Sequence, residues 1–377
     1  MITTNRELQQ LINKIDSQPT LAIDTEFYWR YSYYPQLCLI QIATPDSIYL
    51  IDTMAKTLDL SILQPIFSSP LICKIMHAAS NDIKILKHYV NAIFNNIFDT
   101  QTAMAFLGYP HQMSLQNVLE TLDLFDLDKH EKMSDWRLRP LSETQIAYAK
   151  ADVMYLHPTY NLLKPKLIAI QHDRFFGEEM NEICKNASFT SADKAHLRFH
   201  SQLRRLYGKT YSYLKALAIW RERYAQQKNW LVQHILSDGE LLKIARLHPD
   251  SEKMLADSQI LSNKKVQRYS KLILQALNNS EPVDDPKVEP HNNYYLSIDK
   301  ECTDEAFQLL KKLARQKKIA TAIVCSKRDL IKFVQSYLQD PKNLKSKLSS
   351  GWRFHLFGQK ILDFITTYQL WNTKPIN

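Results

Sequence analysis

The first hundred residues alternate short apolar runs with turn-forming residues, a pattern typical of closely spaced strands. Three such runs occupy residues 21–27, 37–44 and 47–53. Pro35 and the sequence TPDS provide turns between them, so we expect the three strands to pair as an antiparallel meander. Two more apolar runs follow at residues 71–79 and 93–99, and the first is apolar enough to be a fully buried strand.

Elsewhere in the first half, apolar residues recur with the spacing of amphipathic helices. The N-terminal sequence MITTNRELQQLINKI and residues 58–67 and 82–90 show this spacing, and beyond residue 100 it dominates. The longest such segment runs from Ser142 to Leu167, and Ser142 with Gln145 gives the capping-box pattern at its start. Strands followed by β–α units predict an α/β domain whose mixed sheet is flanked by helices.

A weak internal repeat marks the second half of the chain. The sequence ILSDGELLKIA (235–245) aligns without gaps to VCSKRDLIKFV (324–334), and in each a serine with an acid three residues later predicts a helix cap. Residues 278–293, with three prolines and few apolar residues, read as a linker between the two copies. We interpret the repeat as a duplicated small helical domain. The alternative is chance similarity between short amphipathic helices.

Length and composition restrict the class of protein. The chain has 377 residues, 45% of them hydrophobic and 23% charged, which suits two or three globular domains. No apolar run approaches the roughly 18 residues of a membrane span. The five cysteines (Cys38, Cys73, Cys184, Cys302 and Cys325) are scattered and form no C-x-x-C pair, which argues against disulfide frameworks and zinc sites. We therefore expect a cytoplasmic protein without a membrane partner.

The charge is divided unevenly along the chain. Residues 1–200 hold 18 Lys and Arg against 22 Asp and Glu, a net charge of −4. Residues 201–377 hold 30 against 17, a net charge of +13. This division suggests a metal-bearing catalytic part followed by a part that binds a polyanion. Ordinary variation in surface charge is the alternative.

The first predicted strand, LAIDTEF, carries two acids inside an apolar run. Residues two apart on a strand point to the same face, so Asp24 and Glu26 lie side by side. Two buried like charges repel each other, and a cation between them relieves the repulsion. A hard divalent ion such as Mg²⁺ or Mn²⁺ prefers oxygen ligands and fits this pair. The alternative is a strand end at which both acids face water.

Two further acids are placed to join this pair. Asp82 follows the predicted buried strand, near the start of a helix. Asp152 lies four residues after Tyr148, so the two share one helix face. Each acid taken alone is equally compatible with a helix cap or a surface position. Together, Asp24, Glu26, Asp82 and Asp152 could supply four converging carboxylates.

The order of these motifs resembles the DEDD exonuclease superfamily, in its tyrosine-containing branch. More closely, the motifs are similar to those of the ribonuclease D family: AIDTEF, YYPQLCLIQIA, HAASNDIKIL, DTQTA, DWRLRPL and YAKADVMYL. The paired C-terminal modules resemble the helicase-and-ribonuclease-D C-terminal (HRDC) domain. The resemblance implies an α/β ribonuclease-H-like exonuclease domain followed by two small all-α HRDC-like domains. Its expected boundaries are an exonuclease domain at 1–170, a helical linker at 171–208, HRDC-like domains at 209–280 and 294–377, and a linker at 281–293.

The resemblance also implies a site and a chemistry. Asp24, Glu26, Asp82 and Asp152 would hold two divalent ions, Mg²⁺ or Mn²⁺, that activate the attacking water and stabilise the leaving oxygen. Tyr148 would orient that water. Further candidates for substrate contact are Thr25, His77 and Arg139. For His77 the alternative is a buried structural histidine, and for Arg137 and Arg139 it is a salt bridge to a core acid.

The expected activity is hydrolysis of RNA from its 3′ end to nucleoside 5′-monophosphates, in the processing of tRNA precursors and other small structured RNAs. We expect a monomer without an obligate protein partner, in which the basic C-terminal half holds the RNA through its phosphates. Two other functions remain open: a DNA exonuclease of the proofreading type, which could use the same four acids, and a non-catalytic RNA-binding adaptor.

Overall fold

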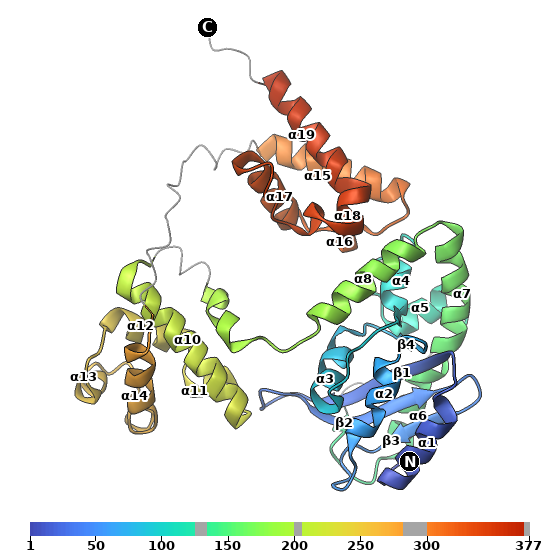
Figure 1. Cartoon of the computed structure of the whole chain (residues 1–377), viewed down its shortest axis with the longest axis horizontal. Coiled ribbons are helices and arrows are strands. Elements are labelled where there is room, and N and C mark those ends of the chain that lie inside the picture. Colours follow the sequence, from blue (N-terminus) through green and yellow to red (C-terminus); the bar gives the residue numbers. More distant parts are fainter. Residues whose placement is uncertain (125–133, 200–205, 282–299, 373–377) are drawn as a thin grey trace. The chain divides into compact units, whose positions relative to one another are not determined.

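The computed structural model of the chain describes residues 1–124, 134–199, 206–281 and 300–372 (Figure 1). The chain divides into two compact units. Unit 1 contains the described residues of Met1–Phe27, Leu37–Ser188 and Asn292–Asn377, and unit 2 contains those of Tyr28–Gln36 and Phe189–His291. Across these residues, no helix is both long enough and apolar enough to cross a membrane. Most of the predicted linker at 278–293 lies outside the described residues.

Unit 1 is built on a five-stranded mixed sheet with the order β3-β2-β1-β4-β5. Its strands are β1 (Thr20–Tyr28), β2 (Gln36–Ala43), β3 (Ile48–Ile51), β4 (Cys73–Met76) and β5 (Ile97–Asp99). Strand β4 runs parallel to both β1 and β5, whereas β2 and β3 pair antiparallel. The sheet confirms the predicted mixed architecture and places β1 at its centre.

Two of the predicted strands are shorter in the structure than in the sequence pattern. The run at 71–79 is a strand only over Cys73–Met76, because Ala78 has a φ of 54° and the chain turns there into the next helix. The run at 93–99 is a strand only over Ile97–Asp99, directly after Asn96, which has a φ of 49°. Left-handed backbone cannot continue a strand, so apolar content alone overestimated both lengths.

Helices cover the sheet of unit 1. They are α1 (Asn5–Ile15), η1 (Leu60–Leu63), α2 (Gln64–Ser68), α3 (Ser80–Val90), α4 (Thr100–Phe106), α5 (Leu115–Thr121), α6 (Glu143–Met154), α7 (Leu156–Ala169) and α8 (Asp173–Asn186). The amphipathic N-terminal helix and the capping box of Ser142 and Gln145 are both confirmed.

The single long helix predicted from Ser142 to Leu167 is wrong, because the structure has two helices that meet at Tyr155. Pro158 gives the physical reason. Proline has no N–H group and clashes with the preceding turn inside a helix, but it is tolerated in a first turn. Starting α7 at Leu156 places Pro158 in that first turn.

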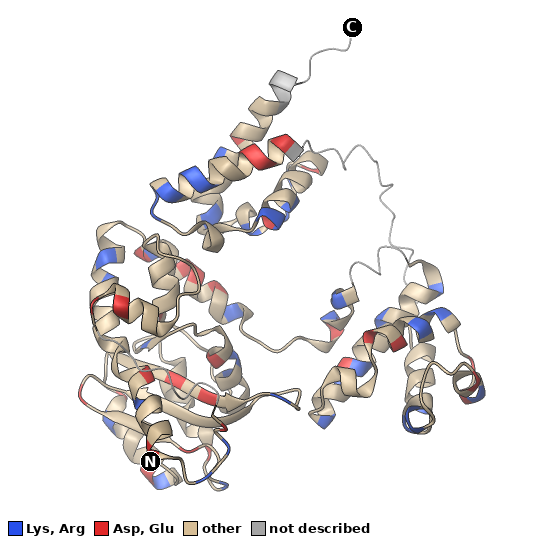
Figure 2. Cartoon of the chain, turned by 180° about the vertical axis from the view of Figure 1, so that it is seen from behind, with Lys and Arg blue, Asp and Glu red and all other residues tan. Residues whose placement is uncertain are grey.

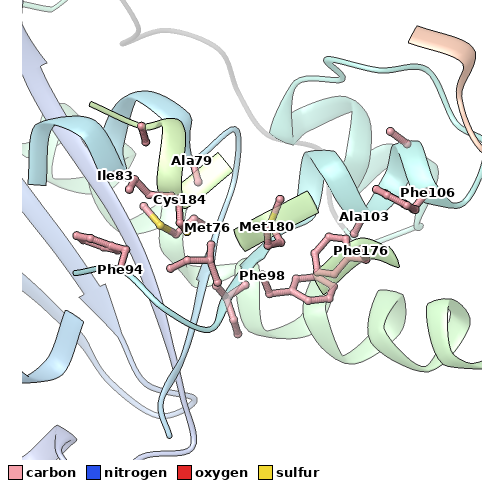
Figure 3. Close-up of a cluster of buried hydrophobic side chains, with 14 of the residues drawn as sticks. Met76, Ala79, Ile83, Phe94, Phe98, Ala103, Phe106, Phe176, Met180 and Cys184 are labelled. Atoms are coloured by element: carbon pink, nitrogen blue, oxygen red, sulfur yellow. The ribbon is translucent and has the colours of Figure 1, made fainter. Parts of the chain in front are cut away.

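Buried side chains join the sheet to the helices that follow it (Figure 3). The labelled part of this core contains Met76, Ala79, Ile83, Phe94, Phe98, Ala103, Phe106, Phe176, Met180 and Cys184. Phe98 on β5 lies 4.9 Å from Phe176 on α8 between ring centroids. The cluster fixes the carboxyl-terminal ends of β4 and β5, where the chain enters α3 and α4.

The C-terminal helices belong to the same unit as the sheet. They are α15 (Lys300–Gln316), α16 (Thr321–Val324), α17 (Lys327–Gln339), η4 (Lys347–Ser349), α18 (Gly351–Arg353), η5 (Phe354–Gly358) and α19 (Gln359–Asn372). Trp352 packs on Phe106 of α4 with ring centroids 4.9 Å apart. The N–H of Ala320 donates to the carbonyl of Ala105 at 2.8 Å. The sequence pattern had left this packing undetermined.

A buried ion pair joins these helices to α8. Glu179 and Arg353 are 7% and 3% exposed, and Arg353 Nη1 lies 2.8 Å from Glu179 Oε2. The indole N–H of Trp352 donates to the same carboxylate oxygen at 2.9 Å. Arg353 also donates to the carbonyls of Ile323 and Val324. One glutamate of the first half therefore satisfies two buried groups of the C-terminal helices.

Unit 2 is helical and has its own apolar core. Its elements are η2 (Ala192–Phe199), α10 (Gly208–Lys228), α11 (Val232–Ile235), α12 (Asp238–Leu247), α13 (Glu252–Asp257) and α14 (Asn263–Asn278). The segment Tyr28–Gln36 packs within this unit: the hydroxyl of Tyr33 donates to Glu222 at 2.5 Å. The two predicted helix caps, Ser237 with Glu240 and Ser326 with Asp329, are both confirmed as capping boxes.

We predict that Glu179→Ala lowers the free energy of unfolding by about 3 kcal/mol, because it removes the buried carboxylate paired with Arg353 and leaves that guanidinium only the half-exposed Glu182, at 3.2 Å. Urea denaturation followed by tryptophan fluorescence measures the change. Glu178→Ala is the matched control, since the Arg174–Glu178 pair is 3.5 Å apart and solvent-exposed. The control should change the free energy of unfolding by less than about 1 kcal/mol. Equal effects of the two substitutions would contradict a role of the ion pair in joining the helices to α8.

Candidate active site

The central strand of the sheet carries the first two acids of the site. Asp24 and Glu26 follow the fully buried residues Leu21, Ala22 and Ile23 on β1, and both are half-buried. Because side chains alternate along a strand, the two carboxylates share one face and Thr25 points the other way. The neighbouring strands β2 and β4 hold β1 on both sides. The sheet therefore fixes the spacing of the two acids.

Asp82 reaches the same region from the helix that follows β4. It lies in the first turn of α3, where a negative charge is favoured by the helix dipole, and it is 8% exposed. The hydroxyl of Thr25 donates a short hydrogen bond to its carboxylate. Since β4 is parallel to β1, its carboxyl end delivers Asp82 beside the acids of β1.

The helix α6 supplies Asp152 and Tyr148 on one face, as their spacing predicted. The hydroxyl of Tyr148 hydrogen-bonds to the carboxylate of Asp152. The ring of Tyr148 lies 6.1 Å from that of the buried Trp136, between centroids. The start of α6 is anchored by its capping box, and the side chain of Gln145 also donates to Ser134 at 2.8 Å.

Three of the four acids converge on one point. Ligand oxygens of Asp24, Glu26 and Asp152 all lie within 4.8 Å of one another. Asp82 is not part of this closest group, although its charge acts on that of Asp24. Within the described residues, no lysine or arginine forms a salt bridge with Asp24, Glu26 or Asp82. A cluster of carboxylates without cations matches the donor set that a hard divalent ion requires.

Burial and mutual repulsion act together on the site. Burial raises the pKa of Glu26 to about 9, and the charges of Asp152 and Asp82 add to the effect. The pKa of Asp24 is raised well above its usual range by burial and then by Asp82, Asp152 and Glu26. Burial raises the pKa of Asp82 to about 7, against the hydrogen bond from Thr25. All the charged groups that shift these three pKa values are acids, so a bound cation would stabilise the cluster.

Burial and the neighbouring acids also shift the pKa of Tyr148. Burial raises its pKa far above the usual value for a phenol, and the charges of Asp152 and Glu26 add to the shift. Its hydroxyl therefore stays protonated at neutral pH and serves as a hydrogen-bond donor, not as a base.

The three side chains predicted to contact substrate have other partners in the structure. Thr25 is 5% exposed and its hydroxyl donates to Asp82. His77 is half-buried, with Nδ1 paired to the hydroxyl of Thr100 at 2.8 Å and Nε2 donating to the carbonyl of Met113 at 3.0 Å. These contacts favour the alternative of a structural histidine.

In the DWRLRPL motif, Arg139 forms the alternative contact, a salt bridge to a buried acid, whereas Arg137 pairs with a partly exposed acid two residues away. Arg139 forms two hydrogen bonds to the carboxylate of Asp52, at 2.6 and 2.8 Å, and a third to the carbonyl of Cys38. Arg137 pairs with Asp135 at 2.6 Å. Arg139 thereby ties the segment that precedes α6 to the end of β3.

One supporting acid was missed at the sequence level. Asp99 is 2% exposed and caps α4, and its carboxylate also accepts from the N–H groups of Ala78 and Ala79 at 3.2 and 2.9 Å. It holds the loop from which α3 presents Asp82. The N-cap signal was present in the motif DTQTA, but the second contact joins residues about twenty positions apart and leaves no local pattern.

Comparisons with known proteins agree with this architecture. A family model described as 3′-5′ exonuclease matches residues 1–168, and the HRDC domain model matches residues 212–277. The crystal structure of Escherichia coli RNase D superimposes with a TM-score of 0.83 at 26% sequence identity, and covers 98% of each chain. An exonuclease domain followed by an HRDC domain is therefore the architecture of this chain.

Two curated relatives extend the similarity along nearly the whole sequence. Ribonuclease D of Bartonella henselae is 31% identical over 369 residues, which cover 96% of this chain and 88% of the relative. Ribonuclease D of Desulfotalea psychrophila is 33% identical over 359 residues, which cover 94% and 95%. The chain belongs to the ribonuclease D family of hydrolytic 3′–5′ exoribonucleases.

Proposed function

We propose that Asp24, Glu26, Asp82 and Asp152 bind two divalent ions, Mg²⁺ or Mn²⁺, and form the site that shortens RNA from its 3′ end. The observation that carries this proposal is the convergence of Asp24, Glu26 and Asp152 within 4.8 Å, where the charges of Asp152 and Asp82 add to the effect of burial in raising the pKa of Glu26. When bound, the ions would activate the attacking water and stabilise the leaving oxygen. The products are nucleoside 5′-monophosphates.

The residues of the chain then have separate tasks. Asp24 and Glu26 fix the centre of the site on a rigid strand. Tyr148 donates a hydrogen bond from a hydroxyl that stays protonated, and in this role it orients the attacking water beside Asp152. Thr25 positions Asp82 through its hydrogen bond and thus acts through another residue.

The substrate that we propose is structured RNA with a single-stranded 3′ end, such as a tRNA precursor. The similar Escherichia coli protein is described as an exoribonuclease involved in structured RNA processing. The net charge of +13 on residues 201–377 supports binding of a folded polyanion in the same way. The acidic site takes the 3′ end, and the basic half holds the body of the RNA.

We also propose the domain organisation that the sequence suggested. An exonuclease domain at 1–170 and a linker at 171–208 precede an HRDC domain at 209–280, a linker at 281–293 and a divergent HRDC-like domain at 294–377. The shared capping boxes of α12 and α17 support a common origin of the two helical domains. We propose that the protein acts as a cytoplasmic monomer.

The first prediction tests the activity. A tRNA transcript with a 3′ single-stranded tail should be shortened one nucleotide at a time in Mg²⁺, to release 5′-mononucleotides, and should stay intact in EDTA. Gel electrophoresis gives the product lengths and chromatography gives the released nucleotides. A DNA oligomer with the tail sequence is the comparison. Faster digestion of the DNA would favour a proofreading-type enzyme, and binding of the tRNA without shortening would favour an adaptor.

The second prediction concerns the metal ligands. Asp24→Asn and Asp152→Asn should each remove nearly all hydrolysis and raise the thermal midpoint of the metal-free protein, because each relieves repulsion between buried acids. Added MgCl₂ should stabilise the wild-type protein, by about 2.7 kcal/mol when its concentration is a hundred times the Kd, and the variants much less. Differential scanning fluorimetry measures these midpoints. Asp46→Asn, an exposed loop residue, is the control and should behave as wild type. Full activity in both active-site variants would refute the ligand assignment.

The third prediction isolates the hydroxyl of Tyr148. Tyr148→Phe keeps the ring against Trp136 and removes only the hydrogen bond to Asp152. The turnover rate should fall about a hundredfold, the lower end of the range for groups that position or transfer a proton. The stabilisation by MgCl₂ should stay unchanged. A joint loss of rate and of Mg²⁺ stabilisation would mean that Tyr148 supports the metal ligands instead of orienting water.

A further inference from the structure

A cavity of about 440 Å³ lies between the sheet-bearing part of unit 1 and its C-terminal helices. It is lined by Leu107, Gly108, Lys311, Arg315, Lys318, Ile319, Ala320 and Thr321. One wall follows the end of α4, and the other is the C-terminal end of α15 with the loop into α16. It lies outside the acidic site, and nothing in the mechanism uses it.

The two walls are held at a fixed distance. Gly108 has a φ of +88°, and a Cβ atom added there would lie 3.2 Å from the carbonyl oxygen of Lys318. The hydrogen bond from Ala320 N–H to the carbonyl of Ala105 closes the same junction. Backbone therefore meets backbone at this junction, which fixes the two walls relative to each other.

The lining of the cavity is strongly positive. Lys311 and Arg315 are four residues apart and share one face at the end of α15, and Lys318 lies in the turn that follows the helix, where it also lines the cavity. All three are exposed, and the lining contains no acid. Figure 2 shows this end of the helix in blue, whereas acids gather toward its other end.

These cations have no acidic partner. Among the described residues, none of the three forms a salt bridge, although other basic residues of the C-terminal helices do, such as Lys327 with Asp304 and Arg353 with Glu179. The ammonium of Lys311 lies 4.9 Å from the ring centroid of Phe307, a contact that supplies no negative charge to neutralise it. Three uncompensated cations around one concavity repel each other and attract an anion.

We propose that the cavity binds backbone phosphates of the RNA whose 3′ end is being shortened. The lining offers cations but no aromatic ring on which a base could stack, so the contact would be with phosphate and independent of sequence. A polyanion suits the site better than a single phosphate, because the three cations line an open concavity instead of enclosing one point. This inference rests on the proposed RNA substrate and adds the place where its body is held.

The test measures binding without hydrolysis. The probe is a fluorescent RNA hairpin with a short 3′ tail, in EDTA, and anisotropy gives the Kd at several KCl concentrations. Each phosphate neutralised on duplex contributes about −0.9 to the slope of log affinity against log salt. The triple variant Lys311→Gln, Arg315→Gln, Lys318→Gln should therefore have a slope shallower by about 2 to 3 and an affinity more than tenfold weaker at low salt.

A matched control separates this cavity from general positive charge. Arg328→Gln, Lys332→Gln, Lys360→Gln removes the same number of lysines and arginines from exposed positions of the C-terminal helices outside the cavity. It should keep the wild-type slope. Circular dichroism checks folding, and the charge-preserving variant Lys311→Arg, Arg315→Lys, Lys318→Arg should restore binding.

Three outcomes would overturn the inference. The first is a wild-type slope in the cavity variant, and the second is an equal loss of slope in both glutamine variants. The third is unchanged RNA binding with lost affinity for a poly-glutamate peptide, which would make the cavity a site for acidic protein segments. Since all measurements are made in EDTA, they do not depend on hydrolysis. A wild-type protein that shows the predicted slopes but does not digest RNA would refute the proposed activity and leave the binding site in place.

Discussion

Repulsion among Asp24, Glu26 and Asp152 is the constraint on which the rest of unit 1 depends. Carboxylates drawn within 4.8 Å of one another separate unless the backbone prevents it. The central position of β1 prevents it for the first two. For Asp152, the capping box and the contacts of Gln145 fix the start of α6. This rigid scaffold holds the acids at a spacing at which either protonation or a bound cation relieves their repulsion.

The need to hold these acids close together also explains several buried polar contacts around the site. Thr25 holds Asp82, and Asp99 holds the loop before α3. Arg139 ties the approach to α6 to Asp52. Thr25 and Arg139 were candidates for substrate contact in the sequence, whereas Asp99 was not. Their positions in the structure show them to be supports for the chain segments that carry the acids.

The predictable parts of the fold are those that are determined by local sequence patterns. The alternation of LAIDTEF placed Asp24 and Glu26 on one face, and the spacing of Tyr148 and Asp152 placed them on one turn. Pro158 also indicated the break at Tyr155, since proline disfavours a helix interior, but the helical periodicity on both sides concealed the break, and α7 does contain Pro165. The partners of Arg139 and Asp99 were not predictable, because Asp52 is 87 residues from Arg139 and tertiary packing alone brings them together.

Unit 2 and the C-terminal helices of unit 1 each contain a buried arginine that donates to a carbonyl near a capping serine, but the two arginines have different acidic partners. In the first, the buried Arg221 donates to the carbonyl of Leu236, next to the capping Ser237, and to Asp238 of the same domain. In the second, Arg353 donates to the carbonyl of Val324, near the capping Ser326, but finds its carboxylate on α8. The arginine of unit 2 therefore pairs with a carboxylate of its own helical unit, whereas Arg353 pairs with carboxylates of α8.

The core of unit 1 is also discontinuous along the chain, since Phe106 and Phe176 belong to one buried cluster with Trp352 and Ile361 although the larger segment of unit 2, Phe189–His291, lies between them in the sequence. On the ribosome, the exonuclease segment emerges first, and its packing partners in the C-terminal helices emerge only after residues 189–291. Until then, apolar surface on α4 and α8 has no cover, a state prone to aggregation and to proteolysis. Premature termination between α6 and α18 leaves all the acidic residues of the active site in a nascent nuclease whose core is unfinished. Synthesis of the C-terminal helices is thus the step that completes the core of unit 1.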